Sequence, residues 1–581
     1  MIDGVMYVLA QNNSIVALDA ATGRERWVHP NEGAVGTRGI NYWESRDRSD
    51  RRLIYINAGF LTEIDARTGK TIQSFGDNGR TDLRVGLDRD RSGARPLQTN
   101  NPGRVFENLI IVPLPAGGAE YEAIPADVHA YDVRTGTLVW VFYSIPRPGE
   151  FGYDTWPPDA WKTAGGVHNW NEMTVDERRG IAYIPFGTAR YDFYGANRKG
   201  ADLFGNSLVA LDARTGKRLW HFQLVHHDLW DYDIPTAPKL LTVRHNGRMV
   251  DVVAQPTKQG FLFVFDRVTG QPLWPIEERP VPQSDIPGEQ SWPTQPFPTL
   301  PPPFARQSFT EKDINPFLPE AEQQALRERL RHSRNEGLFT PPSFRGTIEM
   351  PGNNGGANWG SSAVDPTKGT IYIVSKELPM MLQLGLPGAG REGRGKRGGS
   401  PPETQHSAAA GQPAAAPAAA SPADGSIRYI SPYDFMMMSN GLSAIGPPWS
   451  QLTAYDLNTG RILWQVPNGG VKELEEQGHP NTGSQAPRGG VLVTAGGLVF
   501  VATSSDKKLR AYDQDTGKVI WETGLLAASE GVPAAYETGG REYLVFCVAG
   551  GNGLLPPHIG SDKALPAPDS GAYIAFALPE K

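Results

Sequence analysis

The chain has little of what defines several common classes of protein. Its 581 residues include one cysteine, Cys547, so neither an intramolecular disulfide nor a covalently attached c-type haem with its C-x-x-C-H motif can form. Cys547 lies in the apolar run YLVFCVAG and is expected to be a buried core thiol. No apolar run approaches the length of a membrane span, and no signal peptide is present. The formal net charge of −7 argues against nucleic acid or an anionic membrane as a partner.

One phrase recurs seven times, with the pattern Φ-D-x-x-T-G-x-x-Φ-W, where Φ is apolar. Its aspartates are Asp19, Asp65, Asp132, Asp212, Asp266, Asp456 and Asp513. In each copy an apolar strand ends, Asp and Thr bond the turn backbone, and Gly supplies a positive φ before the next strand begins. Six copies end in tryptophan, namely Trp27, Trp140, Trp220, Trp274, Trp464 and Trp521. These aromatic residues are expected to pack between neighbouring repeats.

The repeat predicts an all-β fold. A single hairpin cannot bury its apolar face, so neighbouring copies must stack. Because strands occur throughout and no long helical periodicity is present, the closed arrangement is a β-propeller rather than a solenoid. We predict one domain over residues 1–581, an eight-bladed propeller of four-stranded antiparallel blades. The chain opens inside a strand pair, so the first blade is expected to be incomplete, and a truncated or misplaced start is expected rather than a natural cytoplasmic terminus.

A second repeat accounts for part of the longest interval, the 190 residues between Asp266 and Asp456. Asn169-Trp170 and Asn358-Trp359 each open a strand, an aspartate turn and another strand. The second stretch is therefore expected to add a blade with a degenerate turn at Asp365. Two segments lie outside the predicted blades. Residues 275–345 are rich in proline and are expected to run over one face of the propeller. Residues 386–427 are of low complexity and are expected to form a disordered loop.

The strongest concentration of reactive side chains is VHHDLWDYDIP, from Val225 to Pro235. Two histidines and three aspartates within eight residues suit a metal cluster or a general-base site, and a solvated loop between blades is the alternative. The following QPTKQGFLFVFD places Lys258 at the head of a strand, so a carboxylate and an ammonium are expected to face each other across neighbouring blades.

Several motifs resemble those of pyrroloquinoline quinone (PQQ) dehydrogenases, most closely the propeller domain of the membrane-bound glucose dehydrogenase type. They are the repeated turn phrase, HHDLWD, P-x-K-x-G, GLFTPPS and the closing AAYETGGREYLVFCVAGGNG. The resemblance covers nearly the whole chain. It implies that Asp231 is the base that takes the substrate hydroxyl proton, and that Lys258 bonds the quinone oxygens. It further implies that Trp170 lies flat under PQQ and that Arg38 pairs with a PQQ carboxylate, roles that suit these side chains physically.

The resemblance assigns further residues to the cofactor and to Ca²⁺. Additional cofactor-binding positions are Trp43, His168, Asn358 and Trp359, and Trp43 stands where the glucose-type branch has a histidine. The implied metal ligands are Asp231 and Glu120, with Glu122 as the alternative to Glu120. Arg190 falls where relatives have a metal-ligating Asn or Thr, and an arginine cannot ligate Ca²⁺. Either Thr188 or Asp192 takes the place of the missing ligand, or the metal site is altered. Arg190 is then expected to turn outward or to neutralise a cofactor carboxylate.

The resemblance implies a periplasmic dehydrogenase that uses PQQ and Ca²⁺ to oxidise a sugar or polyol by hydride transfer. Electrons then pass to membrane ubiquinone or to a soluble cytochrome, because the chain has no haem motif. A PQQ dehydrogenase for another alcohol or a cyclic hydroxy acid is an alternative. A propeller that binds partner proteins without catalysis is a further alternative. The matched set of Asp231, Lys258, Trp170 and Arg38 argues against the scaffold.

Overall fold

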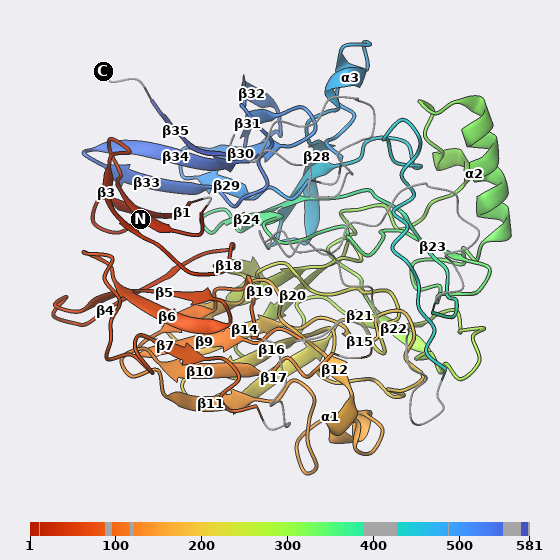
Figure 1. Cartoon of the computed structure of the whole chain (residues 1–581). Helices are drawn as coiled ribbons and strands as arrows, with labels where there is room; N and C mark the ends of the chain where they lie inside the picture. The colour runs from red at the N-terminus through yellow and green to blue at the C-terminus, as the bar shows by residue number, and fades with distance from the viewer. Residues whose placement is uncertain are drawn as a thin grey trace.

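The computed structural model describes residues 1–10, 12–87, 96–116, 121, 123–387, 427–485, 487–549 and 571–578. Its strands form eight antiparallel sheets of three or four strands, the blades of a β-propeller (Figure 1). The eight blades confirm the predicted fold class. Residues 388–426, which make up nearly all of the predicted low-complexity loop, lie outside the described residues.

The blades follow one another in chain order. Blade 1 consists of β1 (Val5–Leu9), β2 (Ile15–Asp19) and β3 (Glu25–His29); blade 2 of β4 (Asn41–Glu44), β5 (Arg51–Asn57), β6 (Phe60–Asp65) and β7 (Arg80–Asp82); blade 3 of β8 (Arg104–Phe106), β9 (Leu109–Pro113), β10 (Val128–Asp132) and β11 (Leu138–Phe142); blade 4 of β13 (Thr174–Asp176), β14 (Ile181–Pro185), β16 (Ser207–Asp212) and β17 (Arg218–Gln223). Blade 5 consists of β18 (Lys239–His245), β19 (Arg248–Pro256) and β20 (Leu262–Asp266); blade 6 of β24 (Ser362–Asp365), β25 (Thr370–Val374), β27 (Gln451–Asp456) and β28 (Arg461–Pro467); blade 7 of β29 (Val491–Thr494), β30 (Leu498–Thr503), β31 (Lys508–Asp513) and β32 (Val519–Gly524); blade 8 of β33 (Ala534–Thr538), β34 (Arg541–Val548) and β35 (Ala572–Ala577).

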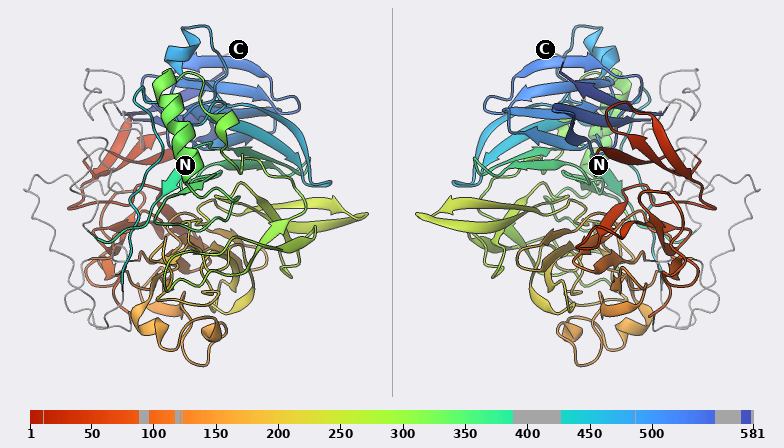
Figure 2. Two further views of the ribbon diagram at one scale, coloured as in Figure 1. Left: turned by 90° about the vertical axis from the view of Figure 1, so that its right-hand side faces the viewer. Right: turned by 90° about the vertical axis from the view of Figure 1, so that its left-hand side faces the viewer.

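Smaller elements lie between the blades. Three two-strand pairs are β12 (Gly165–Gly166) with β15 (Ala189–Arg190), β21 (Ile276–Pro280) with β22 (Thr294–Pro298), and β23 (Thr347–Glu349) with β26 (Met380–Leu382). The helices are α1 (Ala160–Thr163), α2 (Glu320–His332) and α3 (Lys472–Glu475), with 3-10 turns at Tyr153–Thr155 and Glu311–Asp313. Helix α2 lies on the side of the molecule opposite the two termini (Figures 1 and 2). Among the described residues, no helix is long and apolar enough to span a membrane.

Three details differ from the sequence predictions. Blades 5 and 8 have three described strands; after β20 of blade 5, the pairing stops at a single bridge from Phe265 to Pro272, because proline has no N–H to donate. The turn at Asp365 does not add a blade, since it joins β24 to β25 within the blade that also holds the Asp456 turn. The eighth blade is β33–β35 instead. Cys547 in β34 is half-buried and not a core thiol.

The repeated turn explains how neighbouring blades lock together. In blade 4, Asp212 Oδ1 accepts hydrogen bonds from Thr215 N and Thr215 Oγ1 at 2.9 and 3.0 Å. The Trp140 indole of blade 3 lies against Gly216 of this turn and donates to Ala213 O at 3.3 Å. The same contact recurs where Trp220 meets Gly270 and where Trp464 meets Gly517. These tryptophans therefore pack between adjacent blades, as predicted, whereas Trp521 is 42% exposed.

Gly216→Ala is expected to destabilise the chain in two ways. Gly216 has a φ of +70°, and a Cβ there would lie 2.5 Å from the Trp140 ring. The backbone strain costs about 1–2 kcal/mol and the overpacking about 1–3 kcal/mol more. Gly247→Ala is the matched control, because Gly247 has a φ of +77° and no atom within 4 Å of the added Cβ. Chemical denaturation of both variants measures the difference, and equal losses of unfolding free energy would contradict the packing role of the tryptophan.

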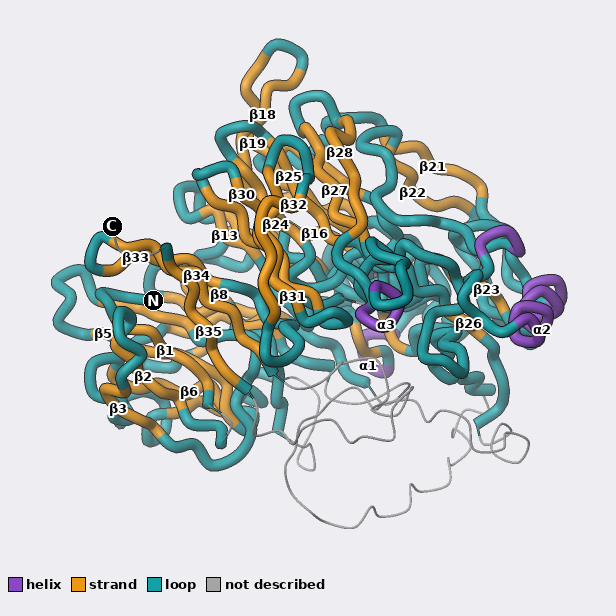
Figure 3. The backbone as a smooth tube through the Cα atoms, turned by 90° about the horizontal axis from the view of Figure 1, so that it is seen from above, coloured by secondary structure: helices purple, strands orange, loops and turns teal. Residues whose placement is uncertain are grey.

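The last blade closes against the first. The Tyr536 hydroxyl donates to Ala20 O at 2.9 Å, and the Tyr573 hydroxyl donates to Leu9 O at 3.0 Å. Seen from above, β33–β35 and β1–β3 lie side by side (Figure 3). The strand directions then define two faces of the ring, because the first and third strands of an antiparallel blade end at the same edge. The repeat turns occupy one face, and the segments that precede the first strand of each blade lie at the other.

Candidate active site

The predicted site residues gather at the face opposite the repeat turns. Arg38 precedes β4, Trp170 precedes β13, Asp231 precedes β18 and Trp359 precedes β24, each just before the first strand of a blade. Lys258 lies in the β19–β20 hairpin, whose turn points to the same face. Residues from four blades are thereby brought together, although 321 positions separate the first from the last in the sequence.

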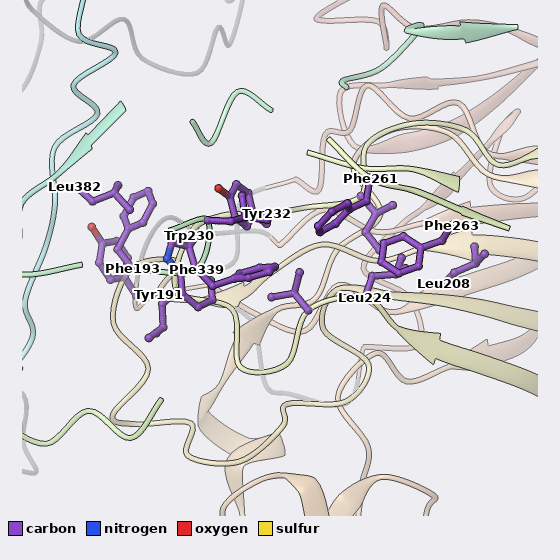
Figure 4. Packing of buried hydrophobic residues seen from close by; sticks show 14 of the residues in the cluster. Tyr191, Phe193, Leu208, Leu224, Trp230, Tyr232, Phe261, Phe263, Phe339 and Leu382 are labelled. Atoms are coloured by element: carbon purple, nitrogen blue, oxygen red, sulfur yellow. The ribbon is translucent and has the colours of Figure 1, made fainter. Parts of the chain in front are cut away.

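Asp231 is held between two large buried side chains. Trp230 and Tyr232 pack in one apolar cluster with Phe339 (Figure 4). The Trp230 indole donates to Thr340 O and the Tyr232 hydroxyl to Pro351 O, both at 2.8 Å. Asp231 itself has a φ of 56°, the left-handed conformation. Since its neighbours are anchored on both sides, the Asp231 side chain is directed away from the apolar cluster and toward polar partners.

The predicted contact between Asp231 and Lys258 is present. Lys258 is buried, and its Nζ donates to Asp231 O at 2.6 Å and to Asp231 Oδ1 at 3.3 Å. The same Nζ donates to Asp233 Oδ2 at 3.3 Å. Asp233 also accepts from the Trp170 indole at 2.8 Å and from Thr188 N at 2.6 Å. One buried ammonium therefore serves two carboxylates that lie two residues apart.

The two carboxylates have opposite proton affinities. Burial raises the pKa of Asp231 well above its usual range; Lys258 lowers it in part, and the charge of Asp233 raises it further. Burial also opposes ionisation of Asp233, but Lys258, His168 and the Thr188 N–H hold its pKa well below the usual range. Burial lowers the pKa of Lys258, yet the surrounding aspartates raise it overall. Asp233 and Lys258 therefore stay charged, and Asp231 is the group that can accept a proton, as a general base must.

Asn353 is a site residue that sequence reasoning missed. Its Nδ2 donates to Asp231 Oδ2 at 3.1 Å, and its backbone N donates to Glu349 Oε2 at 3.1 Å. Glu349 is buried, and burial raises its pKa well above the usual range. The only available signal was the polar run PGNNGGANW, directly upstream of the Asn358-Trp359 pair.

Asp228 has a structural role in the loop. Its carboxylate accepts from Asn206 Nδ2 at 2.8 Å and from the backbone N–H groups of Trp230 and Tyr232 at 2.8 and 2.7 Å. The Thr188 hydroxyl donates to it as well. This carboxylate is occupied with fixing the 228–232 turn and is a poor candidate for the base.

Arg38, Trp170 and Trp359 form one stack. The Arg38 guanidinium lies 4.8 Å from the centroid of Trp170 and 5.5 Å from that of Trp359, and it donates to Trp170 O. His168 is buried close enough to Asp233 to lower its pKa. Asn358 accepts from the Thr236 hydroxyl at 3.1 Å through its carbonyl and shapes the loop that carries Trp359. All five predicted positions lie at the site face, and their cofactor-binding roles remain predictions.

Trp43 lies elsewhere. Its indole donates to Glu107 O at 2.9 Å, the Arg52 guanidinium lies 5.5 Å from its ring, and it packs in the core between blades 2 and 3. It follows Arg38 by five residues, roughly 16 Å along an extended strand, and so lies near the opposite face. These contacts do not support the cofactor-binding prediction for Trp43.

Of the predicted metal ligands Asp231 and Glu120, the structure describes only Asp231. Glu120 and Glu122 lie outside the described residues. Arg190 is not turned outward; its side chain is 14% exposed, forms an ion pair with Asp192 and acts on the pKa values of Asp231 and Asp233. Among the residues that the structure describes, no group of three or more His, Cys, Asp or Glu side chains could hold a metal ion. In the described part of the site, Lys258 and Arg190 place positive charge beside Asp231, one of the predicted metal ligands.

The two histidines of HHDLWD do not take part in the cluster around Asp231. His227 is buried, and its ring contacts Asp202 and Glu289 at 3.2 and 2.9 Å. His226 contacts Glu278 at 3.0 Å, and its backbone is bonded by Gln295. Three of these partners belong to the proline-rich residues 275–345. The histidines therefore fasten this segment over the site face.

His227 is expected to make stability depend on pH. Burial opposes its charge, but Asp202 and Glu289 raise its pKa from 6.5 to about 9. Because the pKa is raised on folding, the stabilisation is complete below pH 6.5 and is lost as the pH rises to about 9. The contribution of His227 protonation to the free energy of unfolding is about 3 kcal/mol at most. Thermal unfolding between these pH values is expected to show a slope that His227→Asn removes and His332→Asn, at an exposed position on α2, retains. An unchanged slope in His227→Asn would contradict the assignment.

Comparisons with known proteins agree with this geometry. The family model for the PQQ glucose/ethanol/alcohol dehydrogenase beta-propeller domain matches residues 1–544. The quinoprotein glucose dehydrogenase of Gluconobacter oxydans is 32% identical, over 100% of this chain and 72% of that protein. The quinate/shikimate dehydrogenase (quinone) of Acinetobacter baylyi is 30% identical, over 99% of this chain and 71% of that protein. The glycerol dehydrogenase large subunit of Gluconobacter oxydans is 32% identical, over 99% and 77%.

Solved structures support the fold. The quinohemoprotein alcohol dehydrogenase from Comamonas testosteroni matches with a TM-score of 0.61 at 22% identity, over 94% of this chain and 69% of that one. A europium-containing methanol dehydrogenase matches with a TM-score of 0.63 at 18% identity, over 95% and 82%. Since the family model spans most of the sequence and a relative above 30% identity aligns from end to end, the chain belongs to the PQQ-dependent glucose/ethanol/alcohol dehydrogenase family.

Proposed function

We propose that the chain is a PQQ-dependent dehydrogenase that oxidises a sugar or polyol hydroxyl. The observation that carries the proposal is the pair Asp231 and Asp233, which share Lys258 while their pKa values are moved in opposite directions. Such a pair separates a proton acceptor from a permanent countercharge. The relatives named for glucose, glycerol and quinate oxidation support the general reaction, in which a CH–OH group is oxidised.

The side chains of the site face suit the predicted cofactor. PQQ, when bound, would supply a quinone able to take up the hydride, and with it the two electrons, from the CH–OH carbon. Trp170 and Trp359 offer aromatic faces for a planar ring system, and the Arg38 guanidinium between them suits a carboxylate. Lys258 is positioned to donate to oxygens near Asp231. The chemistry of this donor set therefore fits a planar, anionic quinone.

Within this arrangement, Asp231 accepts the proton of the substrate hydroxyl. Burial makes its carboxylate a stronger base than an exposed aspartate, and Lys258 holds it in place. Asn353 fixes the second carboxylate oxygen by its bond at 3.1 Å. Asp233 keeps Lys258 protonated throughout, because its own pKa stays low. The substrate proton is thus transferred to Oδ1 or Oδ2 of Asp231, whose carboxylate is oriented by Lys258 on one side and by Asn353 on the other.

Calcium stays a prediction, as do the electron acceptor and the compartment. Of the two predicted ligands the structure describes only Asp231, so no step is assigned to a metal. Glu120, with Asp231, remains the proposed ligand pair. We further propose that the protein works in the periplasm and passes electrons to ubiquinone or a cytochrome.

A scaffold that binds partner proteins is the alternative from a different class. It would not require a fully buried Lys258 shared by two carboxylates, because burying these charges costs free energy that partner binding does not recover. The cluster therefore favours the enzyme.

The test is a dye-reduction assay on the purified chain reconstituted with PQQ. A panel of sugars, polyols, simple alcohols and cyclic hydroxy acids is assayed with calcium and, in parallel, with excess chelator. Turnover of at least one sugar or polyol that disappears when PQQ is omitted is expected. Turnover of cyclic hydroxy acids or simple alcohols alone would overturn the substrate class, and no turnover with any member despite bound PQQ would overturn the proposed activity.

A further inference from the structure

Lys376 is a fully buried lysine that the proposed chemistry leaves unused. It follows β25 in the sequence IVSKELP, at the site face, and its relative exposure is 0%. Its Nζ donates to Asn354 Oδ1 at 2.8 Å, and its backbone N donates to Gly356 O at 2.9 Å. It forms no ion pair with any described residue. A buried ammonium with one neutral acceptor is costly, because it has lost its water without gaining an anion.

A second cation, Arg488, is near enough to act on the pKa of Lys376. Arg488 precedes β29, the first strand of blade 7, just as Trp359 precedes β24 of blade 6. The two segments are packed together: a Cβ on Gly360 would lie 3.3 Å from Gly490 Cα. Burial lowers the pKa of Lys376 well below the usual range, and the charge of Arg488 lowers it further, with Glu530 opposing and Lys258 adding to the effect. Arg488 also forms no ion pair with a described residue.

Lys376 adjoins the loop that completes the proposed site. In residues 353–359, Asn353 bonds Asp231 and Asn358 Nδ2 donates to Asn354 O at 2.9 Å. Gly355 lies so close to Lys258 that a Cβ there would be 2.5 Å from Lys258 Cγ. Asn354 of this loop is the acceptor for Lys376. Lys376 and Lys258 therefore flank the same short loop.

We propose that Lys376 and Arg488 form an anion subsite that binds a carboxylate of PQQ, in addition to the one predicted for Arg38. The inference rests on the proposed function, since a neutral sugar or polyol brings no anion to this face. Glu530 is one carboxylate that acts on the pKa of both cations, so the pair keeps an excess of positive charge that a second anion would stabilise. Charge-assisted hydrogen bonds to an ammonium and a guanidinium are among the stronger polar contacts. Occupation of the subsite also brings Lys376 to its charged form.

The test compares PQQ binding with stability of the chain without cofactor. Lys376→Met is expected to weaken PQQ binding to the apoprotein roughly tenfold to a hundredfold, measured by titration calorimetry. The melting temperature of the same apoprotein is expected to stay the same or rise, because the variant removes a buried amine that has lost its water and has one neutral acceptor. Lys472→Met, at an exposed position on α3, is the matched control and should change neither quantity.

The outcomes separate the subsite from the function as a whole. If the unmodified chain does not bind PQQ, both the subsite and the proposed function fail. If it binds PQQ and Lys376→Met binds equally well, the subsite alone is wrong. A parallel loss of affinity and melting temperature would mean that Lys376 only supports the loop, which also overturns the proposal. Arg488→Met is expected to weaken PQQ binding in the same range, and an unchanged affinity would remove Arg488 from the subsite.

Discussion

Asp231→Asn is expected to lower turnover by at least about a hundredfold while PQQ binding is largely retained. The amide keeps the shape of the carboxylate and its place beside Lys258 and Asn353, but it cannot accept a proton. The loss is expected to be large because the pKa of the neighbouring Asp233 is held low, so that carboxylate is a poor substitute for the base. Dye reduction at saturating PQQ and substrate measures the turnover, and calorimetry measures the cofactor affinity.

The control for this variant is Asp515→Asn. Asp515 is 71% exposed and pairs with Lys368 on the surface, so its loss should leave turnover unchanged. Near-normal turnover of Asp231→Asn would show that another group is the base. Asp233 would then be examined next, although its lowered pKa and its bonds to Trp170 and Thr188 make it a weaker acceptor.

Lys258→Met is expected to destabilise the apoprotein by about 3–5 kcal/mol, the usual loss when one partner of a buried ion pair is removed. Asp231 and Asp233 would then lose the one cation that is paired with both carboxylates in this buried site. Chemical denaturation of the cofactor-free chain measures this loss independently of activity. Lys368→Met removes a cation whose pair with Asp515 is exposed, and it should cost less than about 1 kcal/mol.

A second substitution tests whether charge is the cause. In the double variant Lys258→Met with Asp233→Asn, one of the two uncompensated carboxylates is gone, so part of the lost unfolding free energy should return. A double variant that is less stable than Lys258→Met alone would mean that Lys258 stabilises the chain by packing and not by neutralising the aspartates.

Much of the fold could be predicted because its determinants are local. Each Asp-x-x-Thr-Gly turn uses hydrogen bonds within four residues, such as Asp212 with Thr215. Five of the repeat tryptophans, Trp27, Trp140, Trp220, Trp274 and Trp464, dock on the glycine of the next turn. The place of the Asp365 turn could not be predicted in this way. The Asp365 turn and the Asp456 turn belong to the same blade, and the sequence pattern does not indicate which strands pair in one sheet.

The part of the site that could be predicted consists of residues that lie close together in the sequence. Asp231 and Lys258 lie 27 positions apart, and their contact follows from adjacent segments of the chain. Asn353 joins Asp231 across 122 positions, which no local pattern reveals. The histidines beside Asp231 looked equally reactive in sequence, yet Glu289 binds His227 from the proline-rich segment. Tertiary partners, not residue type, decide which of these groups remain available for chemistry.

The most direct test of the account is the reduction of bound PQQ by substrate without any electron acceptor. The reconstituted chain is mixed anaerobically with the best sugar or polyol of the panel, and the absorbance of the cofactor is followed in a stopped-flow instrument. We predict that about one equivalent of bound PQQ is reduced per chain, and that Asp231→Asn slows this step by at least about a hundredfold. Failure of the chain to bind PQQ, or reduction at the same rate in Asp231→Asn, would contradict it.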